Sequence, residues 1–220
     1  MLVRGSTLAP RSGNVSRFKV YANPQERVRL PNLDRGAGNG VWEALAGARG
    51  EPAEGGVLDQ RELGRLLWAA AGLSEAHVRT HLVPGETSGL EAYALVHAVR
   101  DLSVGRYHYD AREHTLEQLG CGDVRQALAL ALLERDDLEA YALTLVLTGV
   151  PRRLEPHEGS RAYRSLVFEA GAAAQSVVVA ATALGLTGCL VPSFYDAEVA
   201  SLLDLNPRTE PPLAVVLVGR

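Results

Sequence analysis

The longest apolar stretch of the chain, residues 170–186, constrains the possible fold more than any other feature. Gln175, Ser176 and Thr182 interrupt this stretch, so it falls short of the roughly 20 consecutive apolar residues that a membrane-spanning helix needs. The helical spacing of apolar residues also continues upstream. We therefore predict a long buried helix over residues 160–186 at the centre of a globular domain, and no membrane partner.

The composition is typical of a globular protein without nucleic-acid or membrane partners. Of the 220 residues, 47% are apolar and 22% are charged, which is enough to bury one sizeable core. The net charge is only -4 and the basic residues are scattered singly, so the chain has no electrostatic footprint for nucleic acid. Cys121 and Cys189 form no paired motif and no secretory leader opens the chain, which predicts a cytoplasmic protein.

Local patterns predict a mixture of helices and antiparallel strands. Asp59 and Glu62 have the spacing of a capping box at the start of a helix over residues 59–71. Two strands, residues 105–110 and 114–119, are separated by three residues and predict a hairpin. Because helices and strands do not alternate strictly, we predict an α+β fold with a mainly antiparallel central sheet packed by helices. The other expected helices are residues 41–48, 123–133 and 196–203, and the other expected strands are residues 91–99, 143–150 and 213–218.

The first 40 residues differ in composition from the rest of the chain. They mix Pro, Gly, Ser and Asn with little periodicity. Their glycine-rich end, residues 36–40, lacks the Lys-Ser or Lys-Thr pair of a phosphate-binding loop. We predict an irregular N-terminal arm over residues 1–40, followed by a single domain over residues 41–220.

Several phrases, in order and at matching spacing, resemble the SagB-type azoline dehydrogenases of the nitroreductase superfamily. The resemblance covers roughly the last 160 residues, and the phrases together are more specific than any one of them. The phrases are Leu63-Gly64-Arg65-Leu66-Leu67-Trp68, Arg79-Thr80, Gly105-Arg106-Tyr107-His108-Tyr109-Asp110, residues 160–164, Glu169-Ala170-Gly171 and the terminal Val218-Gly219-Arg220.

This resemblance implies a nitroreductase-like fold that forms an intertwined homodimer, with FMN bound at the subunit interface. The helix over residues 170–186 is rich in small apolar residues, which would suit the dimer interface. FMN needs donors and positive charge for its phosphate, and protein groups beside its reactive N5. By position, the resemblance assigns the cofactor contacts to Arg49, Thr80, Gly85, Ser193 and Arg220.

The flavin-binding phrases of the family are altered in this chain. Where the family has Arg-Arg-Ser-x-Arg, only Arg49 remains, and losing two charge-assisted contacts of about 1.5 to 3 kcal/mol each weakens phosphate binding. The family's second loop, Arg-Thr-Ala-Pro-Ser-Ala-Gly-Ala-Leu-Tyr-Pro, here has Val83 and Ser88 at its Ser and Tyr positions. Pro192 stands where the family offers a backbone N–H toward N5, and proline has none. We therefore predict an eroded flavin site.

The family's acid/base pair is also replaced. His157 and Glu158 stand at the place of a Lys-Tyr pair, and proton transfer is chemically possible for both. The surrounding charges also fit a solvated pair in a charged turn. No metal site is predicted, because no carboxylate motif accompanies His77 and His81, which we expect to be exposed.

Two functions remain open from the sequence. The first is an FMN-dependent oxidoreductase that uses NAD(P)H or acts on a substrate such as an azoline. The second is a non-catalytic, flavin-free dimeric module that binds a peptide, another ligand or a partner enzyme through the vacated cleft. A protein that binds flavin without turnover lies between them, and motif counting favours neither of the two functions.

Overall fold

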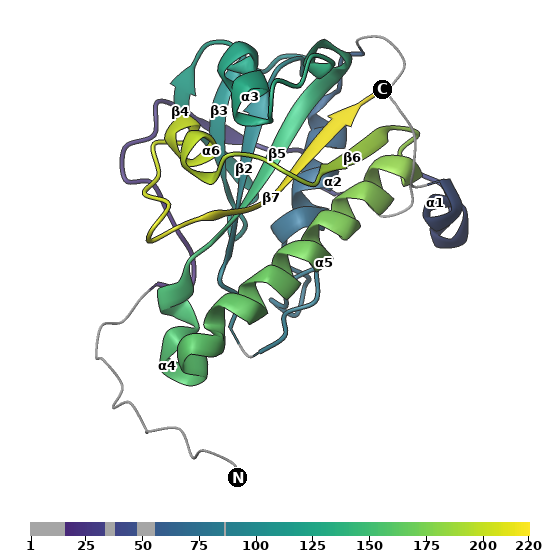
Figure 1. Ribbon diagram of the computed structural model, residues 1–220. Helices are drawn as coiled ribbons and strands as arrows, with labels where there is room; N and C mark the ends of the chain where they lie inside the picture. The colour runs from purple at the N-terminus through teal and green to yellow at the C-terminus, as the bar shows by residue number, and fades with distance from the viewer. Residues whose placement is uncertain (1–15, 34–37, 48–55, 86) are drawn as a thin grey trace.

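The computed structural model describes residues 16–33, 38–47, 56–85 and 87–220, which build a layered α+β fold (Figure 1). At its centre is a seven-stranded sheet in the order β1-β4-β3-β2-β5-β7-β6, and its neighbouring strands pair antiparallel. The predicted fold class is confirmed. The strands are β1 (Arg27–Arg29), β2 (Leu90–Val96), β3 (Gly105–Asp110), β4 (Thr115–Cys121), β5 (Tyr141–Gly149), β6 (Thr187–Val191) and β7 (Pro212–Gly219).

Helices cover both faces of the sheet (Figure 1). On one face, α5 packs against α2, and α1 lies beside α5. On the other face, α3 packs against α6. The central strands β2 and β5 are consequently buried at every residue. The helices are α1 (Val41–Gly47), α2 (Gln60–Ala71), α3 (Arg125–Ala131), α4 (Glu155–Glu158), α5 (Ala162–Ala183) and α6 (Asp196–Leu202).

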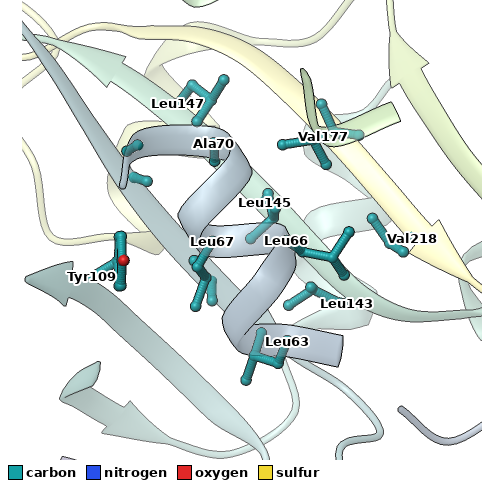
Figure 2. Packing of buried hydrophobic residues seen from close by; sticks show 14 of the residues in the cluster. Leu63, Leu66, Leu67, Ala70, Tyr109, Leu143, Leu145, Leu147, Val177 and Val218 are labelled. Atoms are coloured by element: carbon teal, nitrogen blue, oxygen red, sulfur yellow. The ribbon is translucent and has the colours of Figure 1, made fainter. Parts of the chain in front are cut away.

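Helix α2 begins and ends where the sequence predicts. Oδ1 of Asp59 accepts the backbone N–H groups of Arg61 and Glu62, both at 2.8 Å, and Oε2 of Glu62 accepts the backbone N–H of Asp59 at 2.9 Å. This capping box satisfies N–H groups that the start of a helix leaves without partners. The predicted apolar stripe is fully buried between the sheet and α5 (Figure 2), and it consists of Leu63, Leu66, Leu67 and Ala70.

Helix α5 is the long central helix that the sequence predicts. The segment Glu155–Ala183 is long and apolar enough to cross a membrane by composition, but α5 packs on α2, β6 and β7 as a core helix. One face of α5 remains at the surface, where Tyr163, Val167 and Phe168 are 60%, 45% and 61% exposed. The stretch 170–186, which the sequence predicts as suited to a dimer interface, instead packs its small residues into the core of the domain, with Ala173, Val177 and Ala181 fully buried.

Both edges of the sheet differ from the sequence expectation. Strand β6 follows α5 closely and contains Gly188, so little local β propensity marks it, and its pairing with β7 supplies the missing stabilisation. Strand β1 lies in the segment predicted as an irregular arm and pairs with β4. The neighbouring Leu30 is buried in the core. Described residues of the arm thus pack onto the sheet, while the boundary near residue 40 stays a prediction.

Candidate functional site

The C-terminal arginine lies at the start of helix α2. Nη2 of Arg220 donates a hydrogen bond to Oε1 of Glu62 at 2.5 Å, and the other oxygen of this carboxylate caps the helix. Gly56 packs so closely against the Arg220 side chain that a Cβ would not fit there. Gly56 directly follows the segment that corresponds to the family's arginine phrase. Arg49, the remaining arginine of that phrase, lies outside the described residues.

Thr80 supports the fold at the other end of helix α2. Its hydroxyl donates to the carbonyl oxygen of Trp68 at 2.6 Å, and its backbone N–H donates to the carbonyl oxygen of Gly72 at 3.1 Å. The carbonyl oxygen of Trp68 also accepts the backbone N–H of Gly72 at 2.8 Å, so the hydroxyl adds a second hydrogen bond at the end of the helix. The side chain of Thr80 is therefore already engaged.

One buried carboxylate gathers three donors from the second loop. Glu169, on α5, accepts hydrogen bonds from Nε2 of His81 at 2.9 Å, from the backbone N–H of Gly89 at 3.1 Å and from the hydroxyl of Ser88. The side chains of His81 and Glu169 are fully buried. The expectation of an exposed His81 is therefore wrong, because its partner is 88 residues away in the sequence.

The second loop also meets the predicted acid/base pair. A Cβ at Gly85 would lie only 2.9 Å from Oε1 of Glu158, and Oε2 of Glu158 accepts a hydrogen bond from Ser165. His157 is exposed on the short helix α4, and its side chain forms no hydrogen bond within the described part of the chain. The structure thus brings Gly85 and Glu158 together and leaves His157 in solvent.

Pro192 and Ser193 follow strand β6 and are both exposed. The hydroxyl of Ser193 forms no hydrogen bond to another described residue, so it is free for a ligand. Pro192 has no backbone N–H to offer to a flavin ring. This segment can therefore supply a side-chain donor but not the family's backbone donor.

A cavity of about 830 Å³ opens beside the second loop. Its wall is formed by the loop, including His81 and Gly85, by Arg17 and Phe18 of the N-terminal segment, and by the turn between β3 and β4. The described residues contain no cluster of His, Cys, Asp and Glu that could hold a metal ion. The size of the cavity and the polar and apolar side chains in its wall make it a candidate site for a ligand.

A separate buried polar cluster lies on the sheet face opposite α2. Nδ1 of His108 lies 2.9 Å from Oε2 of Glu117, and Nε2 lies 3.1 Å from Oε2 of Glu91. Arg153 donates to Glu91, and the backbone N–H of Tyr21 donates to Glu117 at 3.0 Å. The cluster therefore ties the N-terminal segment to strands β2, β3 and β4.

The charges in this cluster stabilise one another. Burial by itself would lower the pKa of His108, but hydrogen bonds to Glu117 and Glu91 outweigh burial and raise that pKa above its usual value. Burial by itself would raise the pKa of Glu91, but His108 and Arg153 lower it to about 2. The pKa of Glu117 is lowered as well, mainly because its hydrogen bond to His108 outweighs burial. The arrangement favours an imidazolium between two carboxylates.

Comparison with known proteins decides the family. The model of the nitroreductase family matches residues 2–220 of the chain. The chain belongs to the nitroreductase family. Among curated relatives of this family member, "Putative nitroreductase MJ1384" of Methanocaldococcus jannaschii is 33% identical over 164 residues, which are 74% of this chain and 81% of the relative.

Solved structures share the fold of this nitroreductase-family chain. A nitroreductase-like protein of Ralstonia eutropha JMP134 has a TM-score of 0.76 at 24% identity and covers 96% of this chain and 97% of its own. The E. coli microcin synthetase McbBCD, solved with truncated pro-MccB17 bound, has a TM-score of 0.66 at 21% identity. The match covers 92% of this chain and 77% of the McbBCD chain. A Desulfovibrio desulfuricans structure in complex with FMN has a TM-score of 0.52 at 16% identity. The match covers 82% of this chain and 86% of that chain.

The described residues of this nitroreductase-family chain fit FMN at one end only. The side chain of Arg220 is 49% exposed, and its ion pair with Glu62 lies at the surface. Its guanidinium group could therefore bind a phosphate. Beside the ring, Pro192 offers no N–H, and the hydroxyl of Thr80, another contact that the resemblance assigns, is already engaged. The residues thus fit the phosphate of FMN but not the N5 edge of its ring.

Glu169 is not among the site residues that the sequence predicts. This glutamate lies within the apolar helix α5, in the phrase Glu169-Ala170-Gly171. An ionisable residue in the middle of a buried helix needs a polar partner, because an isolated buried charge is costly. That placement is the signal that could have identified Glu169, although it does not reveal His81 as the partner.

Proposed function

We propose that this chain is a homodimeric, FMN-dependent oxidoreductase of the SagB-like branch of the nitroreductase family, with a reduced flavin site. One observation carries the proposal. Gly56, which directly follows the segment corresponding to the arginine phrase, packs against Arg220. This contact supports the proposal, because the chain next to the arginine phrase then lies beside Arg220, the other phosphate contact that the resemblance assigns.

The proposed roles follow from these positions. Arg220 and Arg49 would hold the phosphate, and Ser193 would donate to another part of the cofactor, with Gly85 lining the cleft. A bound flavin would supply the electron transfer. Glu158, half-buried beside Gly85, is better placed than the exposed His157 to move a proton at a ligand in that cleft.

Substrate and partners are proposed at the level of class. The McbBCD relative was solved with truncated pro-MccB17 bound, which supports a modified peptide or an azoline-containing small molecule as the substrate. The exposed apolar face of α5 supports a second copy of this chain as the partner. The modest net charge and the scattered basic residues support a protein that does not bind nucleic acid, and the two unpaired cysteines support a cytoplasmic location.

A flavin-free dimeric module that binds a ligand is the second candidate, and specific contacts favour it. The carboxylate of Glu62 neutralises Arg220, and the hydroxyl of Thr80 is committed to helix α2. Pro192 removes the ring contact as well. In this function the cleft keeps its shape while its redox chemistry is lost.

The visible absorption spectrum of the purified protein tests the choice. The protein is mixed with FMN and desalted, and the variant Arg220→Gln is treated identically. Flavin bands that survive desalting in the native chain and are weaker in the variant support the first function. Oxidation of NAD(P)H by the flavin-loaded protein would then show oxidoreductase activity. A colourless native protein contradicts the oxidoreductase and supports the flavin-free module.

A further inference from the structure

An irregular N-terminal segment lies over the buried polar cluster of the sheet. Residues 16–21 form neither a helix nor a strand, and each of them is exposed or half-buried. The segment contacts β2, β3 and β4 through Lys19 and Tyr21, and we call it the strap. A segment that buries few apolar side chains can open locally while the rest of the domain stays folded.

Polar contacts with buried side chains hold the backbone of the strap. The N–H of Lys19 donates to Oε1 of Glu91 at 3.0 Å, and Nε of Arg153 donates to the carbonyl oxygen of Ser16 at 2.7 Å. The side chains of Glu91 and Arg153 are only 5% and 4% exposed. The groups that hold the strap are therefore fixed in the domain, whereas the strap has little packing of its own.

The side chain of Lys19 closes the strap. Lys19 is the only lysine of the chain, and its Nζ lies 2.5 Å from Oε2 of Glu210 and 2.7 Å from the hydroxyl oxygen of Tyr93. The ring centroids of Tyr21 and Tyr93 lie 5.0 and 5.4 Å from the same ammonium group. Because Glu210 is nearly buried, its carboxylate would be costly without this cation. The ion pair between Lys19 and Glu210 is therefore the latch of the strap.

The residues before the latch form part of the cavity beside the second loop. Arg17 and Phe18 line this cavity, and so does Gly85, to which the resemblance assigns a cofactor contact. The ring of Phe18 lies against the guanidinium groups of Arg79 and Arg112, whose central carbons are 5.1 and 5.3 Å from its centroid. The strap thus supplies one wall of the proposed flavin cleft, and the latch holds this wall in place.

We propose that the strap is an autoinhibitory lid, which narrows the cleft while Lys19 is paired with Glu210 and lifts as a unit when this ion pair opens. Phe18 adjoins Lys19 in the chain, so release of the latch withdraws its ring from Arg79 and Arg112 and widens the cleft. Lids of this kind control how fast a cofactor or substrate enters. The inference rests on the proposed function, since it concerns regulation of the same cleft.

Cleavage by a lysine-specific endoprotease measures the opening of the strap without flavin. The full chain offers such an enzyme one peptide bond, the one after Lys19, which has to leave the surface of the domain before it can be cut. Glu210→Gln keeps the shape of the side chain but weakens the latch, so cleavage should be about tenfold faster because the open form is more populated. Glu198→Gln, at an exposed carboxylate on α6, is the matched control and should be cut at the native rate.

Amide hydrogen exchange separates a local opening from a general loosening of the fold. Exchange in the strap should be faster in Glu210→Gln, while exchange in helix α2, on the opposite face of the sheet, should stay at the native rate. Equal cleavage of Glu210→Gln and Glu198→Gln, or an equal increase of exchange in the strap and in α2, contradicts the lid.

Stopped-flow fluorescence of FMN tests the link between the strap and the cleft. If the lid controls entry, FMN should associate about tenfold faster with Glu210→Gln than with the native chain or Glu198→Gln. Faster cleavage with an unchanged association rate would show that the strap opens without controlling the cleft, and the proposal would be wrong. If no chain takes up FMN, the proposed function fails, and the cleavage and exchange results still decide whether the strap opens as a latched unit.

Discussion

Nε2 of His81 lies 2.9 Å from Oε1 of Glu169, and both side chains are fully buried. Ser88 and Gly89 donate to the same carboxylate, so both ends of the second loop are tied to the central helix α5. The carboxylate of Glu169 therefore holds the loop from α5, while Thr80 holds its start against the end of α2. Its side chains can differ from those of relatives while its path is kept.

Replacing Glu169 by alanine should destabilise the protein by about 3 kcal/mol, because three buried donors lose their acceptor. Glu169→Gln keeps one acceptor oxygen and should lose less. The free energy of unfolding from urea titrations measures both. Glu198→Gln, at an exposed position, is the control and should stay within about 0.5 kcal/mol of the native chain. A Glu169→Ala variant as stable as this control would refute the role of the carboxylate.

The ion pairs of Glu91 and His108 should contribute most to stability between about pH 4.5 and pH 6.5, while buried His97, whose pKa is lowered to about 4, loses stability as the pH falls below 6.5. The pKa of Glu91 falls from 4.5 to about 2 on folding, so its stabilisation is complete above pH 4.5 and is lost as the pH falls toward 2. The pKa of His108 rises above 6.5, so its stabilisation is complete below pH 6.5 and is lost as the pH rises through the folded-state pKa. Urea titrations from pH 3 to pH 9 would show both slopes.

The alkaline slope should belong to His108. In His108→Gln the imidazolium is absent, so the loss of stability above pH 6.5 should largely disappear although the variant is less stable overall. His157→Gln, at an exposed histidine, should keep the native profile. An unchanged alkaline slope in His108→Gln would show that another group causes it.

The Arg220–Glu62 ion pair predicts how FMN binding responds to substitution. Glu62→Gln keeps an oxygen for the helix cap but removes the negative charge beside Arg220, and FMN affinity should rise about fivefold. Arg220→Gln should lower the affinity by about tenfold. Fluorescence quenching of FMN measures both dissociation constants. Glu198→Gln serves as the charge control, and equal affinities in all the variants would place the phosphate elsewhere.

Local signals predict much of the core of the fold. Asp59 and Glu62 mark the start of α2 through a capping box that needs only neighbouring residues. The short separation between β3 and β4 forces a hairpin. Strands β1 and β6 escape prediction because they are short edge strands, and their stability comes from pairing with β4 and β7.

The candidate site is harder to predict from sequence than the fold. Arg220 is found through the family phrase, but its neutralisation by Glu62 depends on a contact between residues 158 positions apart. His81 is misjudged because its partner Glu169 lies on a different element. The spacing between two polar residues indicates a shared site only where one helix or hairpin carries both, and here the sheet and α5 bring them together.

The exposed face of α5 predicts a homodimer that a single charge should disrupt. Phe168 is 61% exposed and lies next to Val167, and an exposed apolar cluster of this kind usually marks an interface. Phe168→Glu would bury a carboxylate without a partner in the dimer, so the variant should be monomeric in size-exclusion chromatography with light scattering. Leu130→Glu, at a residue that is 62% exposed on α3 on the opposite face, should remain dimeric. If the two variants behave alike, the interface does not use α5. The flavin site proposed between the subunits would then lack the residues of the second subunit on this side.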